Sequence, residues 1–236
     1  HEMGLPVGTP VAVGMIDAHA GGIGTVGVLN GAVSNMAYVF GTSSCTMTTT
    51  PDAVFVPGVW GPYYSAVLPE YWLNEGGQSA TGALIDHVIQ SHPCYDTLLA
   101  QAKSQGQTVY EVLNALLRKM AGEPEDIAFL TRDMHILPYF HGNRSPRANP
   151  TLTGAITGLK LSRTPEDMAR QYLATIQAIA LGTRHIIETM NQSGYTIDTI
   201  MASGGGTKNP IFVQEHANAT GCAMLLPEES EAMLLG

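Results

Sequence analysis

Short apolar runs alternate along the chain with longer stretches in which apolar residues recur every three to four positions. The short runs predict buried strands at residues 11–16, 37–40, 45–50, 196–202 and 223–226. The longer stretches predict helices over residues 78–90, 110–120 and 164–194. Residues 52–74, which are rich in proline, valine and aromatic side chains, predict short strands and loops. Strands that alternate with helices indicate the α/β class.

The helix over residues 164–194 has clear signals at both ends. Thr164 suits an N-cap, Pro165 takes the first helical position, and acidic residues fill the first turn. Apolar residues at mostly four-residue spacing predict one buried face, made by Met168, Tyr172, Ile176, Ile179 and Ile187. Gly194 is placed to end this helix as a C′ glycine.

Glycines are numerous, 26 of 236 residues, and they gather where predicted strands end. Ser203–Asn209 lies between a strand and a helix, where glycine lets the backbone approach a ligand and the helix start offers N–H groups. Such a loop suits a nucleotide, although a tight strand–helix turn explains it equally well. Gly41 and Thr42 lie at a predicted hairpin tip, where amides and hydroxyls can bind phosphate oxygens. Composition alone favours an ordinary polar turn there.

Asp17 follows the first predicted strand and lies beside glycines. A carboxylate in that position can accept a proton from a substrate hydroxyl, and the alternative is an N-cap for the next helix. His19 is more simply explained as a structural histidine. The segment Gly22–Gly27 fits G-x-G-x-x-G. It is separated from the strand and lacks an acidic residue about twenty positions later, so it indicates packing and not a dinucleotide site.

Charge and cysteine content narrow the range of partners. The chain has 11 basic and 20 acidic residues, a net charge of −9, which argues against nucleic-acid and anionic-membrane binding. No apolar run reaches the ~18 residues of a membrane-spanning helix. The cysteines Cys45, Cys94 and Cys222 lie far apart, and the histidines lack metal-ligand spacing. We therefore expect no disulfide framework and no protein-held metal, and reduced thiols suit the cytoplasm.

Both ends of the sequence suggest a piece of a longer protein. The first residue is not methionine, and residues 231–236 have the pattern of a helix that has only begun. We expect further chain beyond these residues.

Five segments, in order, resemble the FGGY family of carbohydrate kinases. They are residues 13–19, 41–43, 75–82, 136–146 and 202–210. Two of them, Glu75–Gly82 and the triplet Asp17-Ala18-His19, resemble the ribulokinase branch in particular. Any one segment is weak, but five in order across nearly the whole chain are specific.

The resemblance implies two actin-like (ribonuclease H-like) domains, each with a mixed sheet flanked by helices, and a cleft between them. Residues 1–31 would be the end of the N-terminal sugar-kinase domain and would include the catalytic aspartate. Residues 32–236 would be the C-terminal nucleotide-binding domain, truncated at its last helix. The partner of this chain would then be the missing N-terminal domain of the same protein, with a homodimer as its assembly.

The resemblance also implies roles for individual residues. Asp17 matches the catalytic base and, with His19, would contact the sugar. The nucleotide-binding positions would be Gly41, Thr42, Gly82, Asp86, Gly204, Gly205, Gly206 and Asn209. Glycerol kinase has glutamine where this chain has Asp86, and again where it has Ala18. Both departures count against glycerol as the substrate and favour a pentulose.

The implied activity is transfer of the γ-phosphate of ATP to the terminal hydroxyl of a pentulose, with D-ribulose first and L-ribulose or xylulose as alternatives. Mg²⁺ would bridge phosphate oxygens. Two other readings of the residues stay open: a non-catalytic actin-like nucleotide-binding module, and a nucleotide-dependent hydrolase on the same fold. Because most sugar contacts of the family lie in the missing domain, we expect this chain alone to bind nucleotide weakly and to be inactive.

Overall fold

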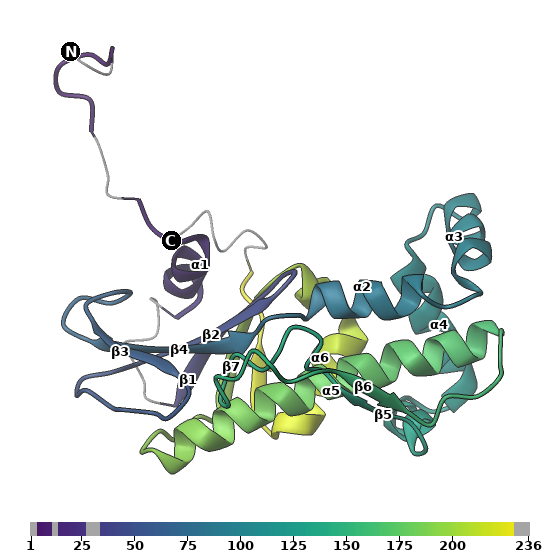
Figure 1. The fold of residues 1–236 in the computed structure, drawn as a ribbon. Coiled ribbons are helices and arrows are strands. Elements are labelled where there is room, and N and C mark those ends of the chain that lie inside the picture. Colours follow the sequence, from purple (N-terminus) through teal and green to yellow (C-terminus); the bar gives the residue numbers. More distant parts are fainter. Residues whose placement is uncertain (1–3, 11–13, 27–33, 229–236) are drawn as a thin grey trace.

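A six-stranded mixed sheet forms the centre of the molecule, in a computed structural model that describes residues 4–10, 14–26 and 34–228 (Figure 1). Its strand order is β3-β4-β2-β1-β7-β8. The strands are β1 (Asn35–Phe40), β2 (Ser44–Thr50), β3 (Trp60–Tyr64), β4 (Trp72–Gln78), β7 (Thr199–Gly204) and β8 (Ala223–Leu225). β1 pairs antiparallel with β2 and parallel with β7. A separate two-stranded sheet joins β5 (His135–Leu137) to β6 (Ala155–Thr157).

Helices cover both faces of the large sheet, as expected for the α/β class (Figure 1). They are α1 (Asp17–Val26), α2 (Gly82–Gln90), α3 (Tyr95–Ser104), α4 (Val109–Ala121), α5 (Pro165–Gln192) and α6 (Pro210–Thr220), with 3₁₀ turns η1 (Pro124–Thr131) and η2 (Gly205–Lys208). In the part of the chain that the structure describes, no helix combines the length and apolarity needed to cross a bilayer.

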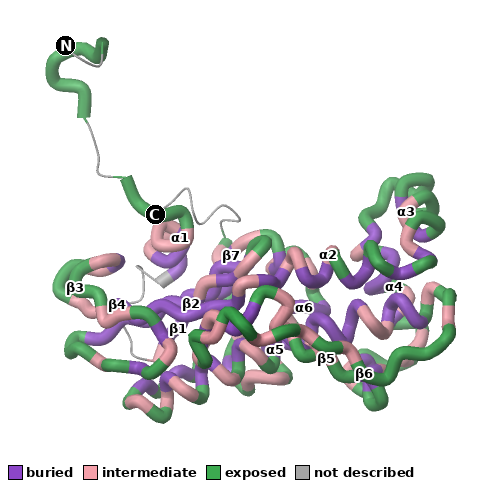
Figure 2. The backbone as a smooth tube through the Cα atoms, in the orientation of Figure 1, coloured by how far each residue is buried: buried purple, intermediate pink, exposed green. Residues whose placement is uncertain are grey.

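Strand β1 separates two hydrophobic clusters, because its side chains alternate between the faces of the sheet. Tyr38 belongs to the larger cluster, which includes residues of α5, α6, α2 and α4. Val39 belongs to a smaller cluster that contacts Ala18 and Ile23 of α1. Figure 2 shows the resulting band of buried backbone through the centre of the sheet. The core therefore lies mainly on the α5 side, and α1 covers the other face.

Most predicted elements are present, and α5 has the predicted ends. The Thr164 hydroxyl accepts a hydrogen bond from the Asp167 amide at 3.3 Å, and Gly194 follows the C-cap with a φ of 114°. The helix predicted over 110–120 is α4, which spans Val109–Ala121. The segment Gly22–Val26 lies in helix α1, which agrees with a packing role, and Gly27 lies outside the described residues.

Several boundaries were predicted wrongly. Gln78 ends strand β4 and does not begin a helix, because it pairs with Ser44 of β2, so α2 begins only at Gly82. Helix α3 is not among the predicted elements, because it buries little beyond Leu98 and Ala102 and so has a weak apolar period. The strand predicted over 196–202 begins at Thr199 and runs to Gly204. Of the loop predicted over 203–209, Gly205–Lys208 form a 3₁₀ helix.

The first predicted strand, 11–16, is not seen as a strand. Residues 11–13 lie outside the described part of the chain, as do residues 231–236. Gly14 to Ile16 are irregular and exposed, and within the described residues they pair with no strand. A strand needs a hydrogen-bonding neighbour, and apolar character alone does not supply one.

The His216 ring is fully buried against β1. It packs 4.0 Å from the Phe212 ring and 5.3 Å from the Tyr38 ring, measured between centroids. The Phe212 carbonyl lies 2.9 Å from Nδ1, so Nδ1–H donates and Nε2 is left to accept from the Tyr38 hydroxyl at 3.3 Å. Burial disfavours the charged ring and lowers the pKa of His216 from 6.5 to about 4.

We predict that His216 makes the protein sensitive to mild acid. The folded-state pKa of about 4 lies below the unfolded value of 6.5. Between these two pH values the unfolded chain therefore binds a proton that the folded chain does not. The free energy of unfolding should fall by roughly 1–3 kcal/mol as the pH drops through it. Urea titrations across this range would measure the slope. His216→Gln should flatten it, and His135→Gln, at an exposed histidine, should not. An unchanged slope in His216→Gln would contradict the prediction.

Candidate functional site

Two glycine turns leave the sheet side by side. β1 and β7 are parallel neighbours, and their registers place Phe40 opposite Gly204. Both strands therefore end at the same edge, where open α/β sheets bind their ligands. After β1, the Gly41 amide bonds the Ser43 carbonyl at 2.9 Å and closes a short turn. After β7, Gly205 begins η2. The sheet thus brings together Gly41 and the Gly204–Gly206 segment, two of the predicted nucleotide-binding regions.

The three glycines of the second turn have different surroundings. Gly204 has a φ of 92°, and a Cβ there would lie 2.2 Å from the Phe40 carbonyl oxygen. A Cβ on Gly206 would lie 2.0 Å from the Phe40 ring. Gly205 has no such neighbour, because no atom lies within 4 Å of its would-be Cβ, and it is exposed. Gly204 and Gly206 thus serve close packing, and Gly205 leaves an open approach to the backbone.

The start of α2 is bonded to the first turn. The Gly82 amide donates to the Gly41 carbonyl at 3.1 Å, and the Thr81 and Ala83 amides donate to the Thr42 carbonyl at 3.0 and 3.2 Å. A Cβ on Gly82 would lie 2.6 Å from the Gly41 oxygen, so only glycine permits this approach. Predicted residues Gly41, Thr42 and Gly82 are therefore neighbours.

The N–H groups at the start of α2 are therefore already bonded to protein carbonyls and are not free to bind a ligand. Gly41 and Thr42 are both exposed. Within the described part of the chain, the Thr42 amide and hydroxyl make no hydrogen bond. Thr42 therefore offers free donors for an anion at this turn.

Asn209 is both a helix cap and part of a polar triangle with the buried Asn114 and Tyr172. Its Oδ1 accepts from the Ile211 and Phe212 amides at 3.2 and 3.4 Å and so caps α6. The same oxygen accepts from Asn114 Nδ2 at 3.0 Å, and Asn209 Nδ2 bonds the Tyr172 hydroxyl at 2.6 Å. The Tyr172 hydroxyl in turn donates to Asn114 Oδ1 at 3.0 Å. The orientation of the Asn209 amide is thereby determined by α4 and α5.

Asp86 connects to this triangle through a second tyrosine. The hydroxyl of Tyr110, at the start of α4, donates to Asp86 Oδ1 on α2. Burial first, and then the Asp86 carboxylate, raise the pKa of Tyr110, which keeps its hydroxyl protonated as the donor. The Tyr110 ring lies 6.0 Å from the Tyr172 ring. Asp86 and Asn209 are thus joined through two tyrosines.

Sequence reasoning missed Tyr110 and Asn114 and assigned Tyr172 only to the apolar face of α5. A polar residue on the buried face of a predicted helix was the available signal for Asn114, which is 5% exposed. Nothing local to the sequence could have shown that Tyr172 faces Asn209, because that contact depends on how α5 and α6 pack.

Asp17 and His19 lie on α1, on the other face of the sheet. Asp17 is exposed and is the first residue of α1, and its Oδ1 accepts the amide of the adjacent Ala18 at 2.7 Å. An N-cap would instead bond the second or third helical amide. His19 Nε2 lies 2.9 Å from a carboxylate oxygen of Glu75 on β4. Among the described residues, no hydrogen bond or ion pair joins Asp17 or His19 to the cluster of Gly41, Gly82 and Asn209.

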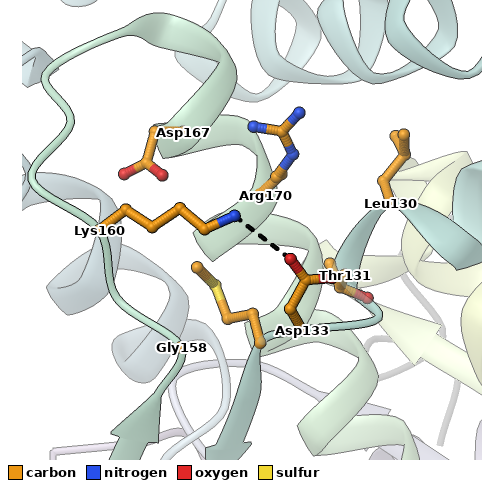
Figure 3. Close-up of a pocket in the computed structure, with 8 residues that line it drawn as sticks. Leu130, Thr131, Asp133, Gly158, Lys160, Asp167 and Arg170 are labelled. Atoms are coloured by element: carbon orange, nitrogen blue, oxygen red, sulfur yellow. Dashed lines mark hydrogen bonds and ion pairs between the residues drawn. The ribbon is translucent and has the colours of Figure 1, made fainter.

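A cavity of about 220 Å³ lies apart from these residues (Figure 3). η1, the segment after β6 and the first turns of α5 line it, with charged side chains of both signs. Lys160 pairs with Asp133 at 3.2 Å, and Asp167 with His92 at 3.3 Å. None of the predicted site residues lines this cavity. It is therefore distinct from the cluster at the sheet edge.

Comparison with known proteins gives one consistent family. Residues 36–236 match the C-terminal domain of the FGGY family of carbohydrate kinases. An FGGY carbohydrate kinase domain-containing protein of Xenopus laevis is 52% identical over 245 residues, which cover 100% of this chain and 44% of that protein. A D-ribulokinase of Saccharomyces cerevisiae is 34% identical over 254 residues, which cover 99% of this chain and 36% of that protein.

The fold comparison agrees. The crystal structure of a xylulose kinase from Rhodospirillum rubrum superposes with a TM-score of 0.70 at 25% identity, over 97% of this chain and 42% of that one. The chain spans less than half the length of each of these three proteins. With a family match over most of its residues, the chain belongs to the FGGY family of carbohydrate kinases.

Proposed function

We propose that this chain is the nucleotide-binding part of an ATP-dependent kinase that phosphorylates the terminal hydroxyl of a pentulose, with D-ribulose as the first candidate. The observation that carries the proposal is the meeting of the Gly41–Thr42 turn with Gly205 at one edge of parallel strands, with an open approach at Gly205. The similarity to a D-ribulokinase favours this sugar, and the similarity to a xylulose kinase keeps xylulose as an alternative.

The exposed first turn would hold the phosphates. The Thr42 amide and hydroxyl supply donors there, and the backbone at Gly205 can approach an anion closely. Asn209 and Asp86, held in place by Tyr172 and Tyr110, would orient the adenosine. Gly204 and Gly206 support this arrangement by allowing Phe40 to pack against the turn.

Magnesium would be held here mainly by the phosphates of the nucleotide. Among the described residues, no group of three or more His, Cys, Asp or Glu side chains could hold a metal ion. Bound Mg²⁺ would neutralise charge on the phosphate oxygens. This chain would hold those phosphates through backbone and hydroxyl donors, and a cluster of carboxylates is not needed.

Asp17 would act as the general base. Its exposed carboxylate would accept the proton of the sugar hydroxyl while that oxygen attacks the γ-phosphorus, and the bond from the γ-phosphorus to ADP breaks. His19, already bonded to Glu75, would lie on the sugar side with Asp17. In this proposal residues 1–31 end an N-terminal sugar domain and residues 32–236 form the nucleotide domain, so closure of the two brings Asp17 to the phosphate.

A second function remains, a nucleotide-binding module without catalysis. The observation that favours it is that Asp17 Oδ1 already accepts the Ala18 amide.

Substitution of Gly205 should weaken nucleotide binding without unfolding the protein. Because a Cβ at Gly205 meets no atom within 4 Å, Gly205→Ala and Gly205→Val should unfold at nearly the wild-type temperature. Each added carbon would occupy the approach to the backbone, so the Kd for MgADP should rise with side-chain size, by roughly tenfold or more for valine. Calorimetric titration measures this.

Two comparisons control the Gly205 series. Gly206→Ala should lower the unfolding temperature, since its Cβ would overlap the Phe40 ring. Asn209→Ala would both uncap α6 and weaken binding, which makes it a less specific probe. Equal MgADP affinity in wild type and Gly205→Val would contradict a nucleotide at this turn.

Replacement of Asp17 tests catalysis separately. In the protein that carries this chain with its sugar domain, Asp17→Asn should lower kcat for pentulose phosphorylation by about 10²–10⁴-fold, because asparagine cannot accept the proton. The affinity for MgADP should stay unchanged. Coupled ADP-release assays with D-ribulose, L-ribulose and xylulose would measure both the loss and the preferred sugar. A variant that keeps full activity would show that Asp17 is not the general base. A wild-type protein that binds MgADP but phosphorylates none of the three sugars would favour the non-catalytic module.

A further inference from the structure

Two sequence segments singled out above, Glu75–Gly82 and residues 136–146, meet at a single side chain. Arg144 lies where β2 begins and β4 ends. Its Nη2 donates to the Ser44 carbonyl at 2.9 Å and to the Gly76 carbonyl at 3.2 Å. The same nitrogen lies 3.2 Å from Cys45 Sγ. One guanidinium thus bridges the two strands beside the phosphate turn.

The geometry of β4 makes room for this guanidinium. Gly77 has a φ of 146°, and a Cβ there would lie 2.3 Å from Arg144 Nη2 and 2.0 Å from the Ser44 carbonyl oxygen. A side chain at position 77 would therefore displace the contact. On its other side the guanidinium lies 5.0 Å from the centre of the Trp60 ring. The arginine is thus held both by hydrogen bonds and by a cation–π contact.

Arg144 contacts the chain on both sides of the proposed phosphate site. Ser44 directly follows the turn formed by Gly41–Ser43, in which the Gly41 amide bonds the Ser43 carbonyl. Ser44 Oγ also accepts the Gln78 amide at 3.3 Å. Gln78 leads within a few residues to Gly82, whose amide bonds the same turn at Gly41. The turn is therefore flanked by the ends of β2 and β4, which pair with each other and which Arg144 bridges in addition.

We infer that Arg144 is a positioning residue, which holds the Gly41–Ser43 turn in the shape that binds the β- and γ-phosphates. This inference rests on the proposed function. Arginine suits the role because its planar guanidinium can donate in fixed directions and stack on Trp60 at once. Lysine keeps the charge but provides neither the plane nor the rigid fork.

The test compares nucleotides that differ only in phosphates. In the protein that carries this chain with its sugar domain, Arg144→Lys should raise the Kd for MgADP and MgATP roughly tenfold or more. The Kd for AMP should change by less than about twofold, because the adenosine contacts at Asn209 are not touched. Arg147→Lys, on the same loop but exposed, is the matched control and should leave all three values unchanged.

A second measurement reports on the turn without ligand. Hydrogen–deuterium exchange of peptides that cover residues 41–46 and 79–84 should become faster in Arg144→Lys and stay unchanged in Arg147→Lys. The amides of Gly41, Thr81 and Gly82 donate hydrogen bonds to carbonyls of the turn. If the turn loses its shape, these bonds break more often and the amides exchange faster.

The outcomes separate the inference from the function on which it rests. Wild-type affinity for MgADP in Arg144→Lys would overturn the inference and leave the proposed function intact. An equal loss of affinity for AMP and MgADP would also overturn it, because a general structural role of Arg144 would weaken the binding of both nucleotides. A wild-type protein that binds neither MgADP nor MgATP would overturn the proposed function and the inference with it.

Discussion

The parallel pairing of β1 with β7 is the interaction on which the rest of the site depends. Its register places Phe40 beside Gly204, so the turns after both strands leave from one edge of the sheet. Phe40 then determines how closely they approach. Its carbonyl oxygen leaves no room for a Cβ at Gly204, and its ring leaves none at Gly206. The same ring packs 4.1 Å from the Phe212 ring. The second turn is wrapped around one buried aromatic residue.

Backbone amides and the Thr42 hydroxyl would form the phosphate end of the proposed site. A chain with a net charge of −9 gives an anion no general attraction. Local N–H donors must compensate for this repulsion. The start of α2 satisfies its own donors with the carbonyls of Gly41 and Thr42, which leaves Thr42 and the exposed backbone at Gly205 facing outward. Helix α2 thus holds the Gly41–Ser43 turn in place, and the turn would bind the phosphates.

How far the sequence predicts this protein depends on the range of the interaction concerned. The ends of α5, the strands β1 and β2 and the start of α6 follow local rules, and these were predicted closely. Gln78 was misassigned because a distant strand, β2, decides its conformation. α3 was missed because two buried residues give almost no periodic signal. Tyr110 and Asn114 were missed because their partners lie on other helices.

The sequence by itself determined both ends of α5 and which family pattern the five segments follow, because caps and short motifs depend on residues a few positions apart. Only the tertiary structure decided that Gly41 meets Gly82, that Asn114 and Tyr172 orient Asn209, and that Arg144 bridges β2 and β4. Those contacts join residues many positions apart. They form only when the register of the sheet and the packing of α4 and α5 bring the partners within hydrogen-bond distance, and no local pattern carries that information.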